Sequence, residues 1–168
     1  MGSGNIGATN VHRSAGTKAG LIVLALDILK GFLALWAAAL ITNNSALGLA
    51  LATVAVMLGH CYPIFLKFKG GKAVACYVGA GLYLAPIALL ATAVIFFAIA
   101  ALTKYVSLAS IASALIFPAI YWAIYRPADE LLIATVLAGL LVAYRHKGNI
   151  ERLRAGKENK FSLKSKVQ

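Results

Sequence analysis

Long apolar runs alternate with short polar segments along most of this chain. A membrane-spanning helix needs about 20 mostly apolar residues, and several runs reach or approach that length. The runs cover residues 19–41, 46–65, 73–102, 106–124 and 131–144.

The run 73–102 is too long for one span, and Gly79, Gly81 and Pro86 mark a break inside it. We divide it into two helices, of which the first is short. The pattern predicts an all-α fold, a polytopic integral membrane helix bundle with about six transmembrane helices. The chain shows no internal repeat at a fixed period and no low-complexity linker. We therefore expect residues 1–168 to form a single membrane-embedded domain.

Composition supports a membrane protein and suggests an anionic partner. Hydrophobic residues make up 61% of the chain and charged residues 12%, which is far more apolar than soluble domains. The net charge of +11 would suggest nucleic acid in a soluble protein. In a membrane protein we expect no nucleic acid, and an anionic lipid surface or a phosphorylated substrate is the better explanation. Cys61 and Cys76 lack a metal-ligand spacing, and we interpret them as buried, unpaired thiols.

Positive charge is distributed unevenly between the two sides of the predicted bundle. If the helices cross the membrane in turn, every Lys and Arg except Lys30 and Arg126 lies on one side. Loops rich in Lys and Arg face the cytoplasm, so that side is predicted to be cytoplasmic. The start, MGSGNIGATNVHRSAG, has no apolar run and no signal-peptide pattern, and it is expected to lie in a cytoplasmic loop.

Three polar segments, 3–13, 59–76 and 145–160, would then meet at the same membrane surface. Each alone has a commoner explanation, because cations flanking helices reach toward headgroups and glycines end helices. The three together predict a shared anion-binding site.

The first segment combines small residues with neutral hydrogen-bond donors. Small residues allow successive backbone N–H groups to converge on an anion. Arg13 adds a guanidinium that can bind phosphate with two hydrogen bonds. The side-chain donors are Ser3, Asn5, Thr9 and Asn10.

The second segment contains Gly70 and Gly71, which free the backbone to turn, and then Lys72. The next helix presents its positive N-terminal end there, which suits a phosphate. A nucleotide P-loop is excluded, because Ala73 stands where Ser or Thr would bind magnesium. His60 either orients this loop or is a satisfied core histidine.

The third segment places His146 and Asn149 three residues apart, on one face of a helix if the helix continues that far. A histidine beside a phosphate site can act as general base or hydrogen-bond the phosphate. Glu158 either pairs with a loop cation or is a solvated tail charge. Ser107 and Ser110 offer hydroxyls, although bonding back to the helix is commoner.

Asp27 and Lys30 lie inside the first span with a spacing at which they neutralise each other, and we expect them to support the fold. The acidic residues form no compact cluster in the sequence, so no metal site is expected. No cofactor is expected either.

The stretches SGNIGATNVHR, GHCYPIFLKFKGGKAVA and RHKGNIERLRAGKENK resemble the three signature segments of the bacterial acyl-phosphate:glycerol-3-phosphate acyltransferases, the PlsY family. LDILKG and YVSLAS are also similar to that family. The resemblance implies a multi-pass enzyme of the bacterial inner membrane with its active site facing the cytoplasm. It would transfer a fatty acyl group from acyl phosphate to the 1-hydroxyl of glycerol 3-phosphate, giving lysophosphatidic acid and phosphate for phospholipid synthesis.

The resemblance also implies roles for individual residues. The positions that match catalytic residues are His146, Asn149, Lys72 and Arg13. The positions that match substrate phosphate-binding residues are Ser3, Asn5, Asn10, Gly70, Gly71 and Ser110, with Ser107 as a less favoured alternative to Ser110. The supporting residues are expected to be His60, Glu158, Asp27 and Lys30.

The chain departs from the family in three places. Family members usually have Gly where Ala73 stands and Thr where Cys76 stands. They also begin with a further transmembrane helix before SGN, seven in all, so we expect a chain truncated at its N-terminus. The expected partners are the two substrates, the lipid bilayer and the enzyme that produces acyl phosphate.

Two other functions stay open at this stage. A transporter or channel for a phosphorylated solute would use the same cations. It would also need polar residues along a path through the bilayer, and these occur only at Asp27 and Lys30. The other function is that of an inactive truncated paralogue that only binds partners or sits in the membrane.

Overall fold

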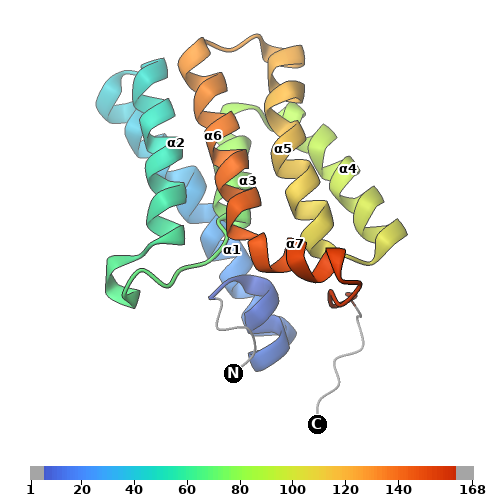
Figure 1. The fold of residues 1–168 in the computed structure, drawn as a ribbon. Coiled ribbons are helices and arrows are strands. Elements are labelled where there is room, and N and C mark those ends of the chain that lie inside the picture. Colours follow the sequence, from blue (N-terminus) through green and yellow to red (C-terminus); the bar gives the residue numbers. More distant parts are fainter. Residues whose placement is uncertain (1–5, 162–168) are drawn as a thin grey trace.

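A computed structural model describes residues 6–161 and shows a helical bundle, with no strand among those residues (Figure 1). The predicted all-α fold is confirmed. In chain order the elements are α1 (Ala8–Thr42), α2 (Ala46–Cys61), the 3₁₀ helix η1 (Ile64–Leu66), α3 (Val74–Leu84), α4 (Pro86–Thr103), α5 (Val106–Tyr125), α6 (Asp129–Arg145) and α7 (Lys147–Arg154).

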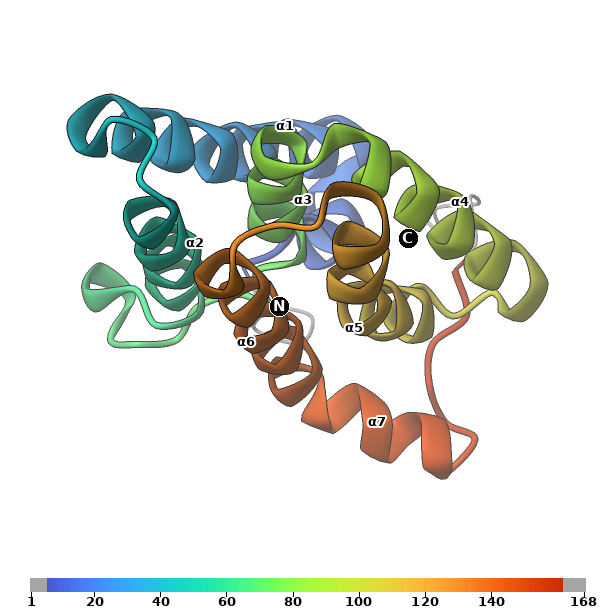
Figure 2. The ribbon, with the colours of Figure 1, turned by 90° about the horizontal axis from the view of Figure 1, so that it is seen from above.

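Helices α1 to α6 run alternately between the two ends of the bundle, and α7 lies across one end (Figure 1). That end also holds the beginning of α1, the loop 62–73 and the turn at Lys104. Seen from above, the loop after α2 and helix α7 extend from different sides of the bundle (Figure 2). The described parts of the three polar segments therefore gather at one end, as predicted.

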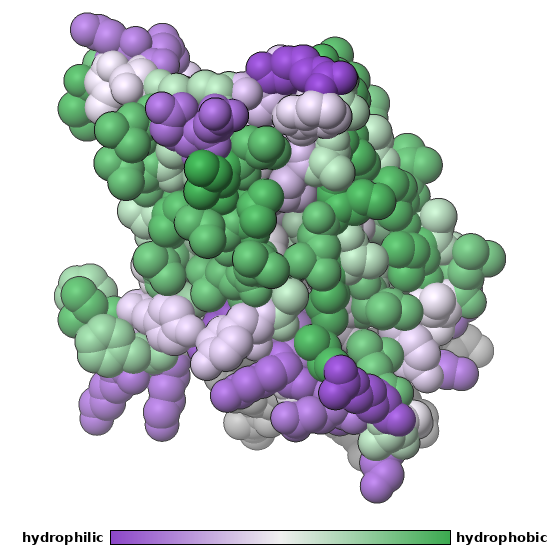
Figure 3. Space-filling view, turned by 45° about the horizontal axis from the view of Figure 1, so that its top comes forward, coloured by the Kyte–Doolittle hydropathy of each residue, from purple (hydrophilic) through white to green (hydrophobic). Residues whose placement is uncertain are grey.

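Within residues 6–161, four helices are long and apolar enough to cross a membrane, and α6 adds a fifth if it is counted with α7, from which it is bent by 57°. Helix α3, with 11 residues, rises only about 16 Å, roughly half of an apolar bilayer core. The predicted short helix in the run 73–102 is thus present. It ends where Pro86 begins α4 with its fixed φ and missing N–H. On the face that Figure 3 shows, a belt of hydrophobic side chains covers these helices.

The start of α1 differs from the prediction of a loop. Residues 8–15 are helical, and the chain folds back at Gly16, whose φ of 87° favours glycine. The first turns then lie so close to Gly20 that a Cβ there would come within 2.8 Å of His12 Cβ. The polar residues of this segment satisfy their backbone groups within a helix, so few backbone N–H groups are left to surround an anion.

The second candidate span runs from Ala46 to Leu66 and matches the predicted span 46–65, although helix α2 itself is shorter. The helix ends at Cys61, and Pro63 follows with no N–H to continue the helical hydrogen bonds. His60 lies in the last turn of this helix.

Helices α1 and α3 approach each other closely through glycines. A Cβ on Gly31 would clash with the carbonyl of Cys76, and a Cβ on Gly79 would clash with the carbonyl of Ile28. This contact brings the charged middle of α1 next to α3 and α2. The main core is then packed by aromatic and aliphatic side chains, including Met57, Tyr77, Phe117 and Val142.

Candidate active site

The loop 62–73 returns along the end of α2 and is held there by backbone hydrogen bonds. Gly70 N–H donates to the carbonyl of Cys61 over 3.2 Å, and Gly71 N–H donates to the carbonyl of His60 over 3.1 Å. A Cβ on Gly70 would clash with the His60 carbonyl, and one on Gly71 would clash with the His60 ring. Close approach is therefore the reason for both glycines, whereas positive φ occurs at Lys67, Phe68 and Ala73.

Lys72 joins this loop to α7. Its Nζ donates to Asn149 Oδ1 over 2.6 Å, and Asn149 Nδ2 donates to Glu158 Oε1 over 2.7 Å. Ser107 Oγ also donates to Glu158 Oε1, and Arg152 Nε lies 2.7 Å from Glu158 Oε2. Four segments of the chain are thus connected through one carboxylate.

Glu158 is held as a carboxylate. Burial raises the pKa of Glu158, but the hydrogen bonds from Asn149, Arg152 and Ser107 together outweigh it, so the pKa lies below its usual value. The sequence left open whether Glu158 pairs with a loop cation or is solvated. The structure shows a third arrangement, in which its partners lie on α5 and α7 and it reaches Lys72 only through Asn149.

His146 lies between α6 and α7 and is 3% exposed. Its Nδ1 lies 2.8 Å from the carbonyl of Val142, which can only accept, so Nδ1 carries the proton and Nε2 carries a lone pair. Burial is the main cause that lowers the pKa of His146 to about 4, and the charge of Lys72 adds to it. The imidazole is therefore neutral at pH 7 and able to accept a hydrogen bond.

Arg145 is a functional candidate that the sequence analysis did not single out. Its Nε and one terminal nitrogen donate to the carbonyls of Gly71 and Gly70, each over 3.1 Å. Its guanidinium also lies 4.9 Å from the centre of the Tyr62 ring. Arg145 thereby fixes the second segment against the third. The available signal was its place at the start of the segment 145–160, directly before His146.

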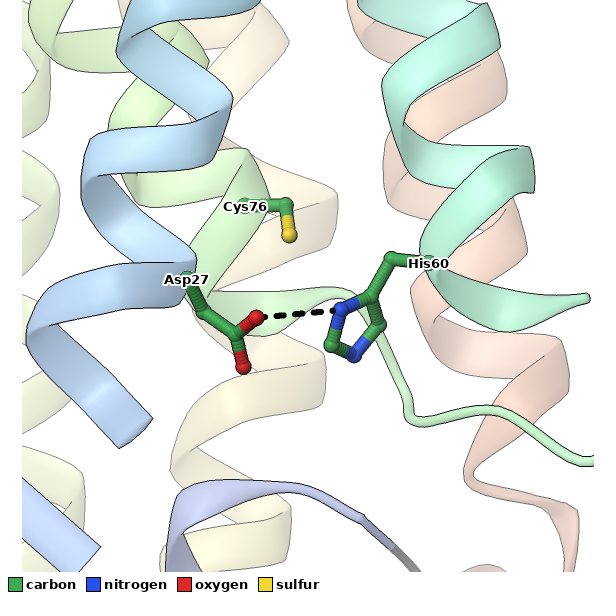
Figure 4. A group of neighbouring side chains, drawn as sticks. All are labelled: Asp27, His60 and Cys76. Atoms are coloured by element: carbon green, nitrogen blue, oxygen red, sulfur yellow. Dashed lines mark ion pairs between the residues drawn. The ribbon is translucent and has the colours of Figure 1, made fainter. Parts of the chain in front are cut away.

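The loop is supported by a polar cluster of Asp27, Lys30 and His60, in which His60 is buried and Lys30 is exposed. Figure 4 shows Asp27 and His60 of this cluster. Lys30 Nζ lies 2.8 Å from Asp27 Oδ1 and 3.0 Å from His60 Nδ1. The same Nδ1 also lies 3.4 Å from Asp27 Oδ1, and Nε2 is the ring atom nearest Gly71. The sequence left two roles open for His60, and these contacts favour orientation of the loop.

Asp27, His60 and Cys76 each offer a ligand atom, and these atoms lie within 4.8 Å of one another. Figure 4 shows the three side chains pointing toward the same space. Sequence spacing could not reveal this group, because its members come from α1, α2 and α3. The ammonium of Lys30 already supplies a cation to two of the three ligand atoms. The absence of a metal site stays a prediction.

Not every predicted site residue is described. Ser3 and Asn5 lie outside the described residues, and the side chain of Arg13 is not described, although its backbone belongs to α1. Asn10 lies in the first turns of α1, before the bend at Gly16. Ser110 bonds back to the carbonyl of Val106, whereas Ser107, the less favoured alternative, contacts the site through Glu158.

A cavity of about 330 Å³ opens beside these groups, at the small end of the range for small-molecule sites. None of its lining residues is acidic. Its cations and aromatic rings come from the loop, the end of α6 and helix α7: Tyr62, Lys72, Tyr144, Arg145, Lys147 and Arg152. Fold and site together define a class: a multi-pass helical membrane protein with a basic cavity for an anion at one end of the bundle.

Comparisons with known proteins identify the family within this class. The family model described as glycerol-3-phosphate acyltransferase matches residues 1–156, so the chain belongs to that family. It is 44% identical to the glycerol-3-phosphate acyltransferase of Trichlorobacter lovleyi over 161 residues, covering 95% of this chain and 81% of the relative. It is 42% identical to that of Syntrophomonas wolfei, covering 98% of this chain and 83% of the relative.

Two solved structures are similar to this one. Both are crystal structures of PlsY (YgiH), an integral membrane glycerol 3-phosphate acyltransferase. The glycerol 3-phosphate form has a TM-score of 0.89 at 38% identity and covers 96% of this chain and 80% of that chain. The lysophosphatidic acid form has a TM-score of 0.87 at 37% identity and covers 95% of this chain and 81% of that chain. The resemblance noted in the sequence is confirmed.

Proposed function

We propose that this chain transfers a fatty acyl group from acyl phosphate to the 1-hydroxyl of glycerol 3-phosphate, which yields lysophosphatidic acid and phosphate. The observation that carries the proposal is the connection of Lys72, Asn149 and Glu158 beside a neutral His146, next to a basic cavity. Membership of the glycerol-3-phosphate acyltransferase family supports it.

The reaction requires one bond to form and one to break at the acyl carbon. The hydroxyl oxygen attacks the carbonyl carbon, and the carbon–oxygen bond to phosphate then breaks, so that phosphate leaves with the electron pair. Acyl phosphate is already activated, and no nucleophilic Ser or Cys is required. The cations of the site offset the negative charge that both phosphates bring.

The hydroxyl proton has two candidate acceptors, His146 Nε2 and a substrate phosphate oxygen. The pKa of His146 is about 4, whereas a phosphate monoester has a second pKa of about 6. An acceptor works best when its pKa is near the working pH, so phosphate is the stronger base here. We assign to His146 the role of orienting the hydroxyl through a hydrogen bond to Nε2.

Phosphate binding is assigned to Lys72 and to the side chains that match the family's first motif, Ser3, Asn5, Asn10 and Arg13. Ser110 stays a candidate donor, since its hydroxyl retains acceptor and rotational freedom. Gly70 and Gly71 let the loop backbone lie close to α2, and Arg145 holds their carbonyls. Asp27 and Lys30 on α1, together with His60 on α2, support the same loop.

The apolar helices show a multi-pass membrane protein. We place it in the bacterial inner membrane with the polar end of the bundle in the cytoplasm, because that end carries nearly all of the Lys and Arg. The proposed partners are the two phosphorylated substrates, the lipid bilayer and the enzyme that produces acyl phosphate. No observation on the described residues favours a transporter, since the charged cluster at Asp27 and Lys30 continues into the active-site loop.

The test is an assay of the purified full chain in detergent or lipid, with acyl phosphate and glycerol 3-phosphate. Phosphate release and lysophosphatidic acid formation are measured together. We expect His146→Ala, which loses the orienting hydrogen bond, to lower kcat/KM by about 10², and Lys72→Ala to lower it by about 10²–10³. Lys157→Ala removes a cation at the same end from an exposed position and is expected to keep parental activity.

Two outcomes would contradict the proposal in different ways. An inactive parental chain that is folded would favour the inactive paralogue. Activity that survives both substitutions would show that the site is placed wrongly.

A further inference from the structure

The loop between α2 and Gly70 extends outward from the bundle (Figures 1 and 2). Its tip exposes large apolar side chains: Phe65 is 98% exposed, Ile64 is 74% exposed and Phe68 is 61% exposed. Two exposed cations, Lys67 and Lys69, alternate with them. Soluble surfaces seldom combine fully exposed aromatic rings with lysines in so short a segment, whereas membrane interfaces favour both.

The conformation of this tip is specific. Lys67 and Phe68 both have positive φ, 50° and 61°, which bulky residues rarely adopt. The tip is nevertheless closed by its own backbone, because Phe68 N–H and Leu66 N–H both donate to the carbonyl of Pro63 over about 3 Å. The positive φ angles make this conformation strained, although its backbone hydrogen bonds hold it closed. Contact between the outward apolar side chains and a surrounding surface can stabilise it.

On this loop, the apolar side chains and the basic side chains lie on different sides. In Figure 3 hydrophobic side chains gather at the lower left, below the hydrophobic belt, and hydrophilic side chains extend further below them. Neither Lys67 nor Lys69 makes a side-chain hydrogen bond or ion pair with the residues that the structure describes. This separation suits an interface, where apolar side chains meet acyl chains and ammonium groups meet lipid headgroups.

We propose that the tip 64–69 is an interfacial anchor that binds the phosphodiester headgroups of anionic lipids through Lys67 and Lys69. Beside these lysines, Ile64, Phe65 and Phe68 insert into the part of the leaflet that lies next to the headgroups. Because Gly70 follows directly, the leaflet holds one end of the loop that presents Lys72 to the cavity. This inference goes beyond acyl transfer, and its test has no catalytic readout.

The first measurement locates the tip. Phe65→Trp is made in a Trp36→Phe/Trp122→Phe background, so that its emission is the only indole signal, and the full chain is placed in nanodiscs with brominated phosphatidylcholine. We expect strongest quenching by lipids brominated close to the headgroup. Emission that no bromolipid quenches would place the tip in water and overturn the proposal in favour of a soluble partner.

The second measurement compares the association of spin-labelled phosphatidylglycerol with that of spin-labelled phosphatidylcholine. A lysine near an anionic surface contributes about fivefold to binding, so Lys67→Gln/Lys69→Gln is expected to lose most of the preference for phosphatidylglycerol. Lys67→Arg/Lys69→Arg keeps the charge and should keep the preference.

A matched control separates a local site from net charge. Lys18→Gln/Lys157→Gln removes two exposed cations from the same end of the bundle but not from the tip. It is expected to keep the preference for phosphatidylglycerol. Equal loss in the two glutamine variants would mean that diffuse charge attracts the lipid, and the proposal would be overturned.

Discussion

His146 has its two ring nitrogens in different states, and this asymmetry defines what it can do. Nδ1 is committed to the carbonyl of Val142, so only Nε2 is directed to chemistry. Burial keeps the ring neutral, since a buried imidazolium beside Lys72 would be doubly unfavourable. A neutral, weakly basic acceptor suits the orientation of a hydroxyl better than the removal of its proton.

The low pKa of His146 predicts the pH dependence of the reaction. With a pKa of about 4, the ring stays neutral at every pH above about 5, so its protonation produces no loss of activity between pH 5 and 8. We expect an acid limb near pH 6, where the glycerol 3-phosphate dianion takes up a proton. The measurement is kcat/KM against pH with glycerol 3-phosphate and with its phosphonate analogue, which has a higher second pKa.

The position of the acid limb distinguishes protonation of the substrate from protonation of a group of the protein. A limb that moves to higher pH with the phosphonate belongs to the substrate. A limb that stays at one pH belongs to a group of the protein, and the role assigned to His146 would then be wrong.

The helices were largely predictable, because the length of an apolar run and a proline near its middle are local properties. The break before Pro86 and the short α3 follow from them. The helical start of α1 was not predictable, because its polar residues suit a loop equally well and the fold-back at Gly16 depends on packing against Gly20. Arg145 was missed for the same reason, since its acceptors are the carbonyls of Gly70 and Gly71, far away in sequence.

The contact between α1 and α3 makes a prediction at the scale of the element. Gly79→Ala places a methyl group against the backbone of Ile28, which cannot move without separating the helices. Overpacking costs about 1–3 kcal/mol, and for a chain of this size each kcal/mol lowers Tm by about 2–4 °C. We expect a fall of several degrees in a thermal melt of the detergent-solubilised protein, together with lower activity.

Gly81→Ala is the matched control on the same helix. Its added methyl group would meet only side-chain atoms, with Phe117 Cζ nearest at 3.2 Å, and such tips can move by a few tenths of an ångström. Its Tm should stay within about 2 °C of the parent. An equal fall for both variants would indicate loss of glycine flexibility rather than a clash between two helices.

At the scale of the whole molecule, the two ends of the bundle differ in charge and in function. One end carries the basic cavity, α7 and the tip 64–69, and the other carries short turns with Arg126, whose guanidinium lies 3.6 Å from the centre of the Trp122 ring. Aromatic rings and isolated cations of this kind anchor a helix at the lipid interface. The described groups assigned to phosphate chemistry therefore lie at the same end of the bundle.

Orientation is testable with single cysteines, because native Cys61 and Cys76 are fully buried. Lys157→Cys marks the basic end, and Ala128→Cys marks the opposite turn, where the chain is exposed. With a membrane-impermeant maleimide, we expect Lys157→Cys to be labelled only in inverted vesicles and Ala128→Cys only in intact spheroplasts. Labelling of Lys157→Cys in spheroplasts would place the basic cavity outside the cell. A phosphorylated cytoplasmic substrate would then be unable to reach it, and the proposed orientation of the bundle would be overturned.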